Sequence, residues 1–391
     1  MRIAFFLNRV PDPCGAFFHD VALARVLQSR GHQVMFIICT RQLPARGTYR
    51  GIPYVVFEVA EKDLERTDIW CTPHAPAVAI GLVRKLNQKF QKPLVVSMHY
   101  GEDTQTVRDA KTDCPEFLWI VSDHIRAKTL EKPISPSFKD VQVFRPIFLE
   151  SELRLFSAPT LPTGDCITLI NANPLKGLGV FLEMARRFPN KKFLGVRPYY
   201  NIVNVPTLPN IEWMDLQEDI RNVFAKTRVV LMPSLYESWG RVAFEAMFNG
   251  IPVLYTKPIE NPSYPTGSTE GLHAWISESA IGCDSRGPEE WVAGITALDS
   301  PETYASYSAK AYACTSAMNI FDESAIIESR LKDYVTKYSV ARQPELEPSF
   351  LVGGMRQRMV SRPSQAQPQA VAPQDMRLRM PASIGRFGRR R

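Results

Sequence analysis

Long apolar runs and paired cysteines are both missing from this chain of 391 residues. No stretch of about 18 apolar residues occurs, so the sequence predicts no membrane-spanning helix. The first residues, Arg2 to Asn8, turn polar too early for a secretory signal and are typical of a first strand. The seven cysteines stand singly, without a Cys-x-x-Cys pair or a zinc-ligand spacing. This pattern excludes a disulfide framework and favours reduced thiols in a cytoplasm.

An excess of charge is also missing from most of the chain. Residues 341–391 contain ten arginines, no lysine and three acids, which amounts to the whole net charge of +7. Residues 1–340 contain 37 basic and 37 acidic side chains. The last segment is poor in large apolar residues, so we predict that it is disordered. Two interpretations of its arginines stay open: a solvated, dispensable extension, or contact with a polyanion, either nucleic acid or an anionic membrane surface.

The sequence is rich in short apolar runs that alternate with amphipathic segments. This alternation predicts parallel sheets wrapped by helices. A break near 151–164, which contains Pro and Gly, separates two such series. We therefore predict an α/β fold in which two doubly wound, Rossmann-like domains, 1–157 and 158–340, face a cleft. In such domains the carboxyl ends of the strands bind the ligand.

The predicted strands and helices follow the hydrophobic pattern directly. We expect strands at 3–7, 34–38, 52–57, 69–71, 94–98 and 118–121 in the first domain, and at 166–171, 192–196, 211–214, 229–232, 252–255 and 281–283 in the second. We expect helices at 17–30, 179–187 and 289–298, and Gly31 is predicted to end the first of them.

One segment of the second domain places two carboxylates at a strand-to-helix connection. Glu237 follows an apolar run, and Glu245 lies one to two turns into the predicted helix, on a face that it shares with Arg241. Each carboxylate accepts a pair of hydroxyl hydrogen bonds, which a sugar and a ribose offer. Gly240 opens the helix between them, where free backbone N–H groups favour a phosphate. The segment therefore predicts a site for a phosphorylated sugar nucleotide.

The segment Glu237-Ser-Trp-Gly-Arg-Val-Ala-Phe-Glu245 resembles the Glu-x7-Glu signature of retaining glycosyltransferases of the GT-B fold, in particular family GT4. Pro233-Ser234 precedes it and Gly250-Ile-Pro-Val253 follows it, as in that family. The resemblance extends over roughly residues 1–335. It implies a nucleotide-sugar donor in the second domain and an acceptor bound mainly by the first.

Three further motifs resemble places in the family pattern. Asn173-Pro-Leu-Lys-Gly177 is similar to an element whose lysine contacts the donor diphosphate, which implies that role for Lys176 beside Gly177. The strand that ends in His99 resembles the family's Thr-x-His strand, which implies a histidine beside the donor sugar. Gly15 takes the place of the family's glycine-rich loop, where the backbone approaches the phosphates.

The chain departs from the family pattern at two places. Family members carry a Gly-Arg pair five residues before the lysine, and this chain has Asn171-Ala-Asn173 in that region. Either Arg197, which follows the next strand, or Arg241 supplies the missing cation, or the leaving group is stabilised less strongly than in the family. The loop 258–268 is longer than usual, which leaves the identity of the donor open.

The resemblance implies transfer with retention at the anomeric carbon and without a metal ion or another cofactor. No Asp-x-Asp run suited to a metal-bound diphosphate is present. Lys176 is assigned to the diphosphate and Glu237 to sugar hydroxyls. Glu245 is assigned to the ribose and His99 to the edge of the sugar. The expected donor is a UDP-, GDP-, ADP- or TDP-sugar, and the expected acceptor is a glycan, a lipid or a small molecule.

Other functions remain open. One alternative is a hydroxylated base in DNA as the acceptor, with the arginine-rich segment 341–391 tethering the enzyme to that polymer. The neutral charge of the remaining chain argues against this alternative. A non-enzymatic nucleotide- or glycan-binding protein of the same fold is a second alternative, as are a sugar-nucleotide epimerase and a disaccharide phosphorylase. We expect the protein in the cytoplasm, at a membrane surface or bound to nucleic acid.

Overall fold

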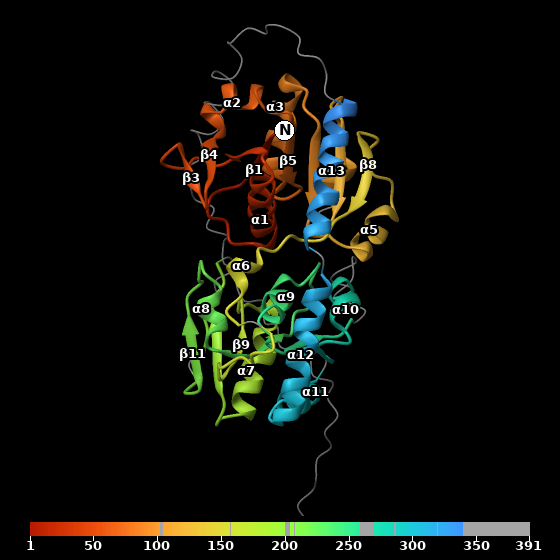
Figure 1. Cartoon of the computed structure of the whole chain (residues 1–391). Helices are drawn as coiled ribbons and strands as arrows, with labels where there is room; N and C mark the ends of the chain where they lie inside the picture. Colours follow the sequence, from red (N-terminus) through yellow and green to blue (C-terminus); the bar gives the residue numbers. More distant parts are fainter. Residues whose placement is uncertain are drawn as a thin grey trace, which may run out of the picture. The chain divides into compact units, whose positions relative to one another are not determined.

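The computed structural model of the chain (Figure 1) describes residues 1–101, 105–156, 158–199, 204–206, 208–258, 269–284, 287–318 and 320–338. These residues belong to one compact unit. The segment predicted to be disordered, 341–391, lies outside the described residues, as does the long loop 258–268 apart from its first residue. All seven cysteines are free thiols.

The first sheet has eight strands in the order β3-β4-β2-β1-β5-β6-β7-β8. These are β1 (Arg2–Leu7), β2 (Gln33–Ile38), β3 (Arg46–Tyr49), β4 (Ile52–Val56), β5 (Ile69–Pro73), β6 (Leu94–Met98), β7 (Glu116–Ile120) and β8 (Phe138–Val143). The strand pairs are parallel, except that β3 and β4 are antiparallel. The strand order reverses between β1 and β5, and ligands of α/β sheets bind at such a switch point.

The second sheet has six parallel strands in the order β11-β10-β9-β12-β13-β14. These are β9 (Cys166–Leu169), β10 (Lys192–Val196), β11 (Ile211–Met214), β12 (Thr227–Met232), β13 (Val253–Thr256) and β14 (Ile281–Cys283). Its switch point lies between β9 and β12. The predicted α/β fold with two Rossmann-like domains is therefore confirmed.

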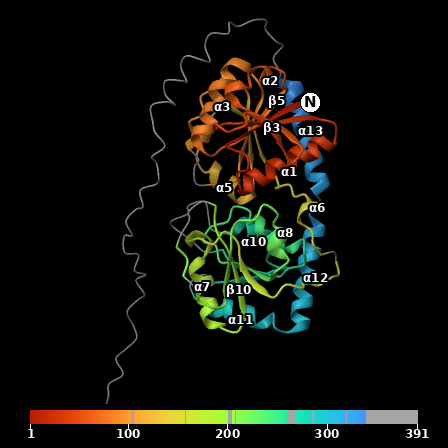
Figure 2. The same cartoon turned by 90° about the vertical axis from the view of Figure 1, so that its left-hand side faces the viewer.

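Helices cover both faces of the first sheet, with α3 on one side and α13 on the other (Figure 2). The helices are α1 (Gly15–Ser29), α2 (Glu61–Glu65), α3 (Ala77–Phe90), α4 (Gln105–Arg108), α5 (Asp123–Leu130), α6 (Glu150–Leu153), α7 (Leu178–Arg187), α8 (Arg221–Phe224), α9 (Arg241–Met247), α10 (Glu270–Ile276), α11 (Glu289–Ala297), α12 (Pro301–Ala317) and α13 (Ile320–Tyr338), with 3₁₀ turns at Phe57–Val59 and Pro174–Lys176. Within the described part of the chain, none of them has the length and apolar character needed to cross a membrane.

Two strands that the sequence does not predict, β3 and β8, form the edges of the first sheet. The residues of β3 alternate between exposed and half-buried, and most of β8 is half-buried or exposed. An edge strand has one open side, so it carries polar residues and lacks the apolar run of a central strand. The hydrophobic pattern therefore detects the central strands and misses these two.

The last helix, α13, packs against the first sheet, whereas the predicted division assigned 158–340 to the second domain. The ring of Tyr334 stacks on that of Phe117 with centroids 3.6 Å apart, and Figure 1 shows α13 beside β8. Ile327, Leu331 and Tyr334 are buried at helical spacing. The apolar stripe of α13 packs on β7. A stripe in the sequence shows that a helix covers a sheet, but it does not specify which sheet, and this explains the difference.

Candidate active site

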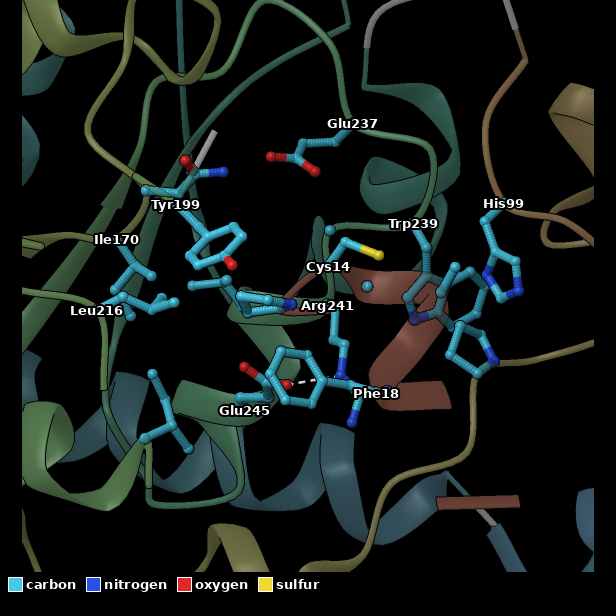
Figure 3. Close-up of a pocket in the computed structure, with 18 of the residues that line it drawn as sticks. Cys14, Phe18, His99, Ile170, Tyr199, Leu216, Glu237, Trp239, Arg241 and Glu245 are labelled. Atoms are coloured by element: carbon cyan, nitrogen blue, oxygen red, sulfur yellow. Dashed lines mark hydrogen bonds and ion pairs between the residues drawn. The ribbon is translucent and has the colours of Figure 1, made fainter. Parts of the chain in front are cut away.

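A cavity of about 1000 Å³ lies between loops of the two sheets (Figure 3). Its walls come from the segments that follow β1, β5 and β6 in the first sheet and β9, β10, β11 and β12 in the second. It is thus bordered by the carboxyl ends of strands, where this fold class binds ligands. Of the predicted site residues, these line it: Gly15, His99, Lys176, Glu237, Gly240, Arg241 and Glu245.

Lys176 is placed by a short turn that depends on Asn173 and Gly177. The side chain of Asn173 accepts hydrogen bonds from the backbone N–H groups of Leu175 and Lys176, at 2.9 and 3.2 Å. Gly177 then adopts a φ of +82°, and a Cβ atom there would lie 2.2 Å from the carbonyl oxygen of Pro233. A residue without a side chain is therefore required where the loops after β9 and β12 touch.

That contact brings together Lys176 and Glu237, which lie 61 positions apart in the sequence. The Nζ atom of Lys176 is 2.6 Å from Oε1 of Glu237. The hydroxyl of Ser234 donates a hydrogen bond of 2.7 Å to the same oxygen. Only 11% of the Glu237 side chain is exposed. The carboxylate is therefore fixed by two donors on one oxygen, and its orientation is set before any ligand arrives.

Arg241 and Glu245 form a second pair of opposite charge at the start of α9. Nε of Arg241 donates to Oε1 of Glu245 at 2.6 Å, and Nη1 donates to the backbone carbonyl of Ile147 at 2.9 Å. The guanidinium also lies 4.2 Å from the ring centroid of Phe148. Burial raises the pKa of Glu245, and the adjacent Arg241 opposes this effect. Gly240, with a φ of +77°, precedes the helix.

Two predicted residues come from the first domain. Gly15 is the first residue of α1, whose first turn has no acidic residue and no side-chain cap, so that its backbone N–H groups are available to an anion. His99 follows β6. Burial, with nearby His74 and Arg241, lowers the pKa of His99, and its Nε2 atom is buried without a hydrogen-bond partner among the described residues. His99 is thus a neutral ring with an unsatisfied nitrogen.

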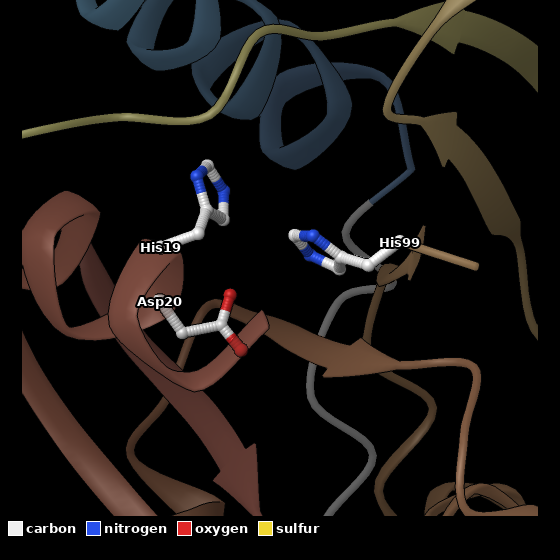
Figure 4. A group of neighbouring side chains, drawn as sticks. All are labelled: His19, Asp20 and His99. Carbon is white, nitrogen blue, oxygen red and sulfur yellow. The ribbon is translucent and has the colours of Figure 1, made fainter. Parts of the chain in front are cut away.

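His99 also belongs to a group of three side chains with His19 and Asp20 (Figure 4). Their ligand atoms lie within 4.8 Å of one another, which is close enough to hold a cation. However, Nδ1 of His19 accepts a hydrogen bond of 3.0 Å from the backbone N–H of Ile147. A metal-binding histidine normally carries a proton on its other nitrogen and donates it. This hydrogen bond therefore disfavours a cation on His19, and the group is better explained as a buried polar cluster.

The remaining two predicted residues lie outside the cavity lining. Gly177 acts on the site through the turn that it allows. Arg197 is 42% exposed, and its Nη1 atom is 3.4 Å from Oδ1 of Asp215. Its guanidinium lies 5.7 Å from the ring centroid of Trp213. The phosphate role of Arg197 therefore stays a prediction that this conformation does not favour.

Several residues of the cavity escape sequence reasoning because their partners are far away in the chain. Glu152 contacts both Arg25 and Arg50, and Arg50 also donates to the carbonyl of Glu218 at 3.1 Å. Next to the cavity lining, the hydroxyl of Tyr236 accepts a hydrogen bond of 3.0 Å from the backbone of Gly101. An isolated arginine or tyrosine carries no local pattern, so only the folded structure reveals these links between the domains.

The match to known families falls on the segment that contains most of this site. Residues 169–297 match the family model described as glycosyl transferases group 1. This chain is a glycosyltransferase. The matched segment includes Lys176, Glu237, Arg241 and Glu245 of the enzyme. No curated protein sequence resembles the enzyme closely enough to match it.

Solved structures with the same architecture are known. Sucrose-phosphate synthase from Thermosynechococcus elongatus has a TM-score of 0.65 at 13% identity, over 86% of this chain and 100% of that chain. Anabaena HepE in complex with UDP and glucose has a TM-score of 0.64 at 13% identity, over 85% and 100%. An α-glucosyltransferase in complex with UDP and a 13-mer DNA containing an HMU base has a TM-score of 0.59 at 14% identity, over 86% and 100%. The glycosyltransferase shares their fold, GT-B.

Proposed function

We propose that this glycosyltransferase transfers a sugar from a nucleotide-sugar donor to an acceptor hydroxyl, with retention and without a metal ion. The observation that carries the proposal is the pairing of two cations with two carboxylates in one cavity, Lys176 with Glu237 and Arg241 with Glu245. A nucleotide sugar offers an anionic diphosphate flanked by a sugar and a ribose, both rich in hydroxyls. Two of the similar structures hold UDP, which supports a nucleotide donor.

Each charge pair has one partner for the phosphates and one for hydroxyl groups. Lys176 has three N–H donors, so it can hold Glu237 and contact the diphosphate at the same time. Glu237 binds the hydroxyls of the donor sugar, and Glu245 binds those of the ribose. As the bond to the leaving group breaks, negative charge grows on the diphosphate, and a cation already in place stabilises it without reorganisation.

Arg241 supplies the second cation in this proposal, in place of the arginine that is absent from Asn171-Ala-Asn173. It lines the cavity and is held by two hydrogen bonds, whereas Arg197 is exposed and pairs with Asp215. The backbone at Gly15 and Gly240 approaches the phosphates. This assignment selects one of the three alternatives that the sequence leaves open.

Retention follows in this proposal from the position of the donor. The leaving phosphate accepts the proton of the acceptor hydroxyl on the same face of the sugar that the phosphate leaves. The protein then contributes position and charge stabilisation, and the neutral ring of His99 contacts the edge of the sugar. Anomeric configuration of the product, read by NMR, tests retention, and turnover in the presence of a chelator tests independence from metal ions.

Glu237→Gln tests the assignment directly. UDP-, GDP-, ADP- and TDP-sugars are first screened by thermal shift and mass spectrometry to find the donor. We expect Glu237→Gln to lower turnover with that donor on the order of 100-fold, because a fixed carboxylate is lost from the donor sugar. Glu212→Gln, at an exposed glutamate paired with Lys226, is the control. Full turnover by Glu237→Gln would refute the assignment, and binding without turnover by the native enzyme would indicate a binding protein.

A second candidate function is glycosylation of a hydroxylated base in DNA. The observation in its favour is the charge of residues 341–391, which hold the whole net charge of +7. One of the similar structures, the α-glucosyltransferase, is bound to DNA that contains an HMU base. In this proposal the arginine-rich segment binds the phosphate backbone and raises the local concentration of acceptor bases.

A further inference from the structure

The segment that leaves β8 crosses between the two sheets, and Ile147 lies in the middle of it. This residue is fully buried. Water therefore cannot satisfy its peptide groups, and their hydrogen bonds must come from protein atoms. Both groups of Ile147 are in fact bonded to side chains, one from each domain.

The backbone N–H of Ile147 donates to Nδ1 of His19, at 3.0 Å. His19 lies on α1 and is 1% exposed. Burial lowers the pKa of His19 well below its ordinary value, and His99 and Arg241 add to this effect. The ring is therefore neutral, and its Nδ1 lone pair is available as an acceptor. The ring also packs against Phe144, with centroids 4.8 Å apart.

The carbonyl of Ile147 accepts a hydrogen bond of 2.9 Å from Nη1 of Arg241. The next residue, Phe148, lies under the same guanidinium. Arg241 thus has three contacts that fix its plane, and two of them belong to the crossing segment. The third is the ion pair with Glu245.

We propose that His19 is a positioning residue for Arg241. Ile147 connects them, in an arrangement that we call the relay. The N–H of Ile147 donates to His19, and the carbonyl of Ile147 accepts from the guanidinium of Arg241. The orientation of a donor-side cation is thereby set by a histidine of the first domain that does not line the cavity. The relay rests on the proposed function only in that Arg241 is the group that binds the donor diphosphate.

If a residue without an acceptor atom replaces His19, the buried N–H group of Ile147 has no hydrogen-bond partner. The crossing segment must then shift to find another partner. A shift of Ile147 moves its carbonyl away from Nη1 of Arg241. We therefore expect weaker binding of a nucleoside diphosphate, although His19 touches no part of the cavity. A replacement that retains an acceptor near the position of Nδ1 is expected to preserve binding.

A double-mutant cycle tests the relay in the full chain, with UDP as the probe and calorimetry as the readout. The variants are His19→Leu, which removes the acceptor, Arg241→Met, and the double variant. His19→Leu is expected to weaken UDP binding roughly 5- to 20-fold in the native background and less than about 2-fold in the Arg241→Met background. His19→Asn, whose Oδ1 atom replaces Nδ1, is expected to remain within about 3-fold of the native affinity. Leu27→Ala, at a buried position of the same helix, controls for loss of stability.

The relay is overturned if the loss caused by His19→Leu is equal in both backgrounds, or if His19→Asn loses as much affinity as His19→Leu. Absence of UDP binding by the native protein would instead contradict UDP as the donor nucleotide. In that case the four proteins of the cycle, which are the native protein, His19→Leu, Arg241→Met and the double variant, are unfolded in urea without ligand. Non-additive free energies of unfolding then support the link between His19 and Arg241, and additive ones refute it.

Discussion

At the scale of single residues, Gly177 determines where Lys176 lies. Its φ of +82° excludes a side chain, as does the carbonyl oxygen of Pro233, which would lie 2.2 Å from a Cβ atom at this position. We predict that Gly177→Ala lowers the free energy of unfolding by about 2 kcal/mol or more and weakens donor binding. Gly179→Ala is the matched control, because a Cβ atom at this helical position meets nothing within 4 Å. The control is expected to be neutral or slightly stabilising in urea unfolding. Equal losses for the two variants would contradict the explanation.

His19 gives a prediction about pH. Its pKa is lowered by burial, while a histidine in the unfolded chain has a pKa of about 6.5. Below that pH the unfolded state binds a proton that the folded state does not, so the free energy of unfolding falls as the pH falls. The slope from one histidine reaches about 1.4 kcal/mol per pH unit, and it vanishes above neutral pH. Urea unfolding between pH 5 and 7.5 should show a shallower slope for His19→Leu than for the native enzyme. Parallel curves would show that His19 does not titrate in this way.

The sequence could predict the residues whose chemistry is local. Glu237, Arg241 and Glu245 lie within one short segment and Lys176 lies in a short turn, and the resemblance of both segments to a family pattern indicated them. The role of His19 could not be predicted, because its partner is a backbone group 128 positions away. A backbone group has no identity that a sequence pattern records, and the same limit applies to Tyr236 and Gly101.

At the scale of elements, burial decides what the sequence reveals. The central strand β6 was predicted at its observed bounds because all five of its residues are buried and apolar or small. Strand β9 ends earlier than predicted, at Leu169, and Asn171 has a φ of +63°, which a strand does not allow. The edge strands β3 and β8 were missed. Patterns therefore predict elements buried on both faces more accurately than elements at an edge.

Helix α13 gives a prediction at this scale, because Tyr334 joins it to the first sheet. Tyr334 stacks on Phe117, and its hydroxyl donates to Asp140 at 2.8 Å. We expect Tyr334→Ala to lower the free energy of unfolding by about 3 kcal/mol and Tyr334→Phe by about 1 kcal/mol, measured in urea. Ile326→Ala, at a 45% exposed position on the same helix, should change it by less than about 0.5 kcal/mol. A similar loss for the alanine variants at 326 and 334 would mean that α13 does not depend on this contact.

At the scale of the whole molecule, two repeats of one α/β pattern predicted two domains and a cavity between strand ends. The same reasoning misplaced α13, because the order of elements along a chain does not fix which core a final helix covers. Charge is distributed at this scale as well. The balanced composition of residues 1–340 contrasts with the ten arginines of residues 341–391. An experiment on the role of this charge must therefore compare the full chain with residues 1–340.

The arginine-rich segment predicts binding of double-stranded DNA that depends strongly on salt. Each phosphate neutralised by an arginine releases a counterion, so the logarithm of the binding constant falls with the logarithm of the salt concentration, with a slope of about −0.9 per contact. If most of the ten arginines in 341–391 take part, the slope is about −5 to −9. Gel-shift titrations at several salt concentrations should show this slope for the full chain and little binding for residues 1–340. Equal binding by both proteins would remove the reason for placing DNA among the acceptors, because the charge-balanced remainder would then account for all the affinity.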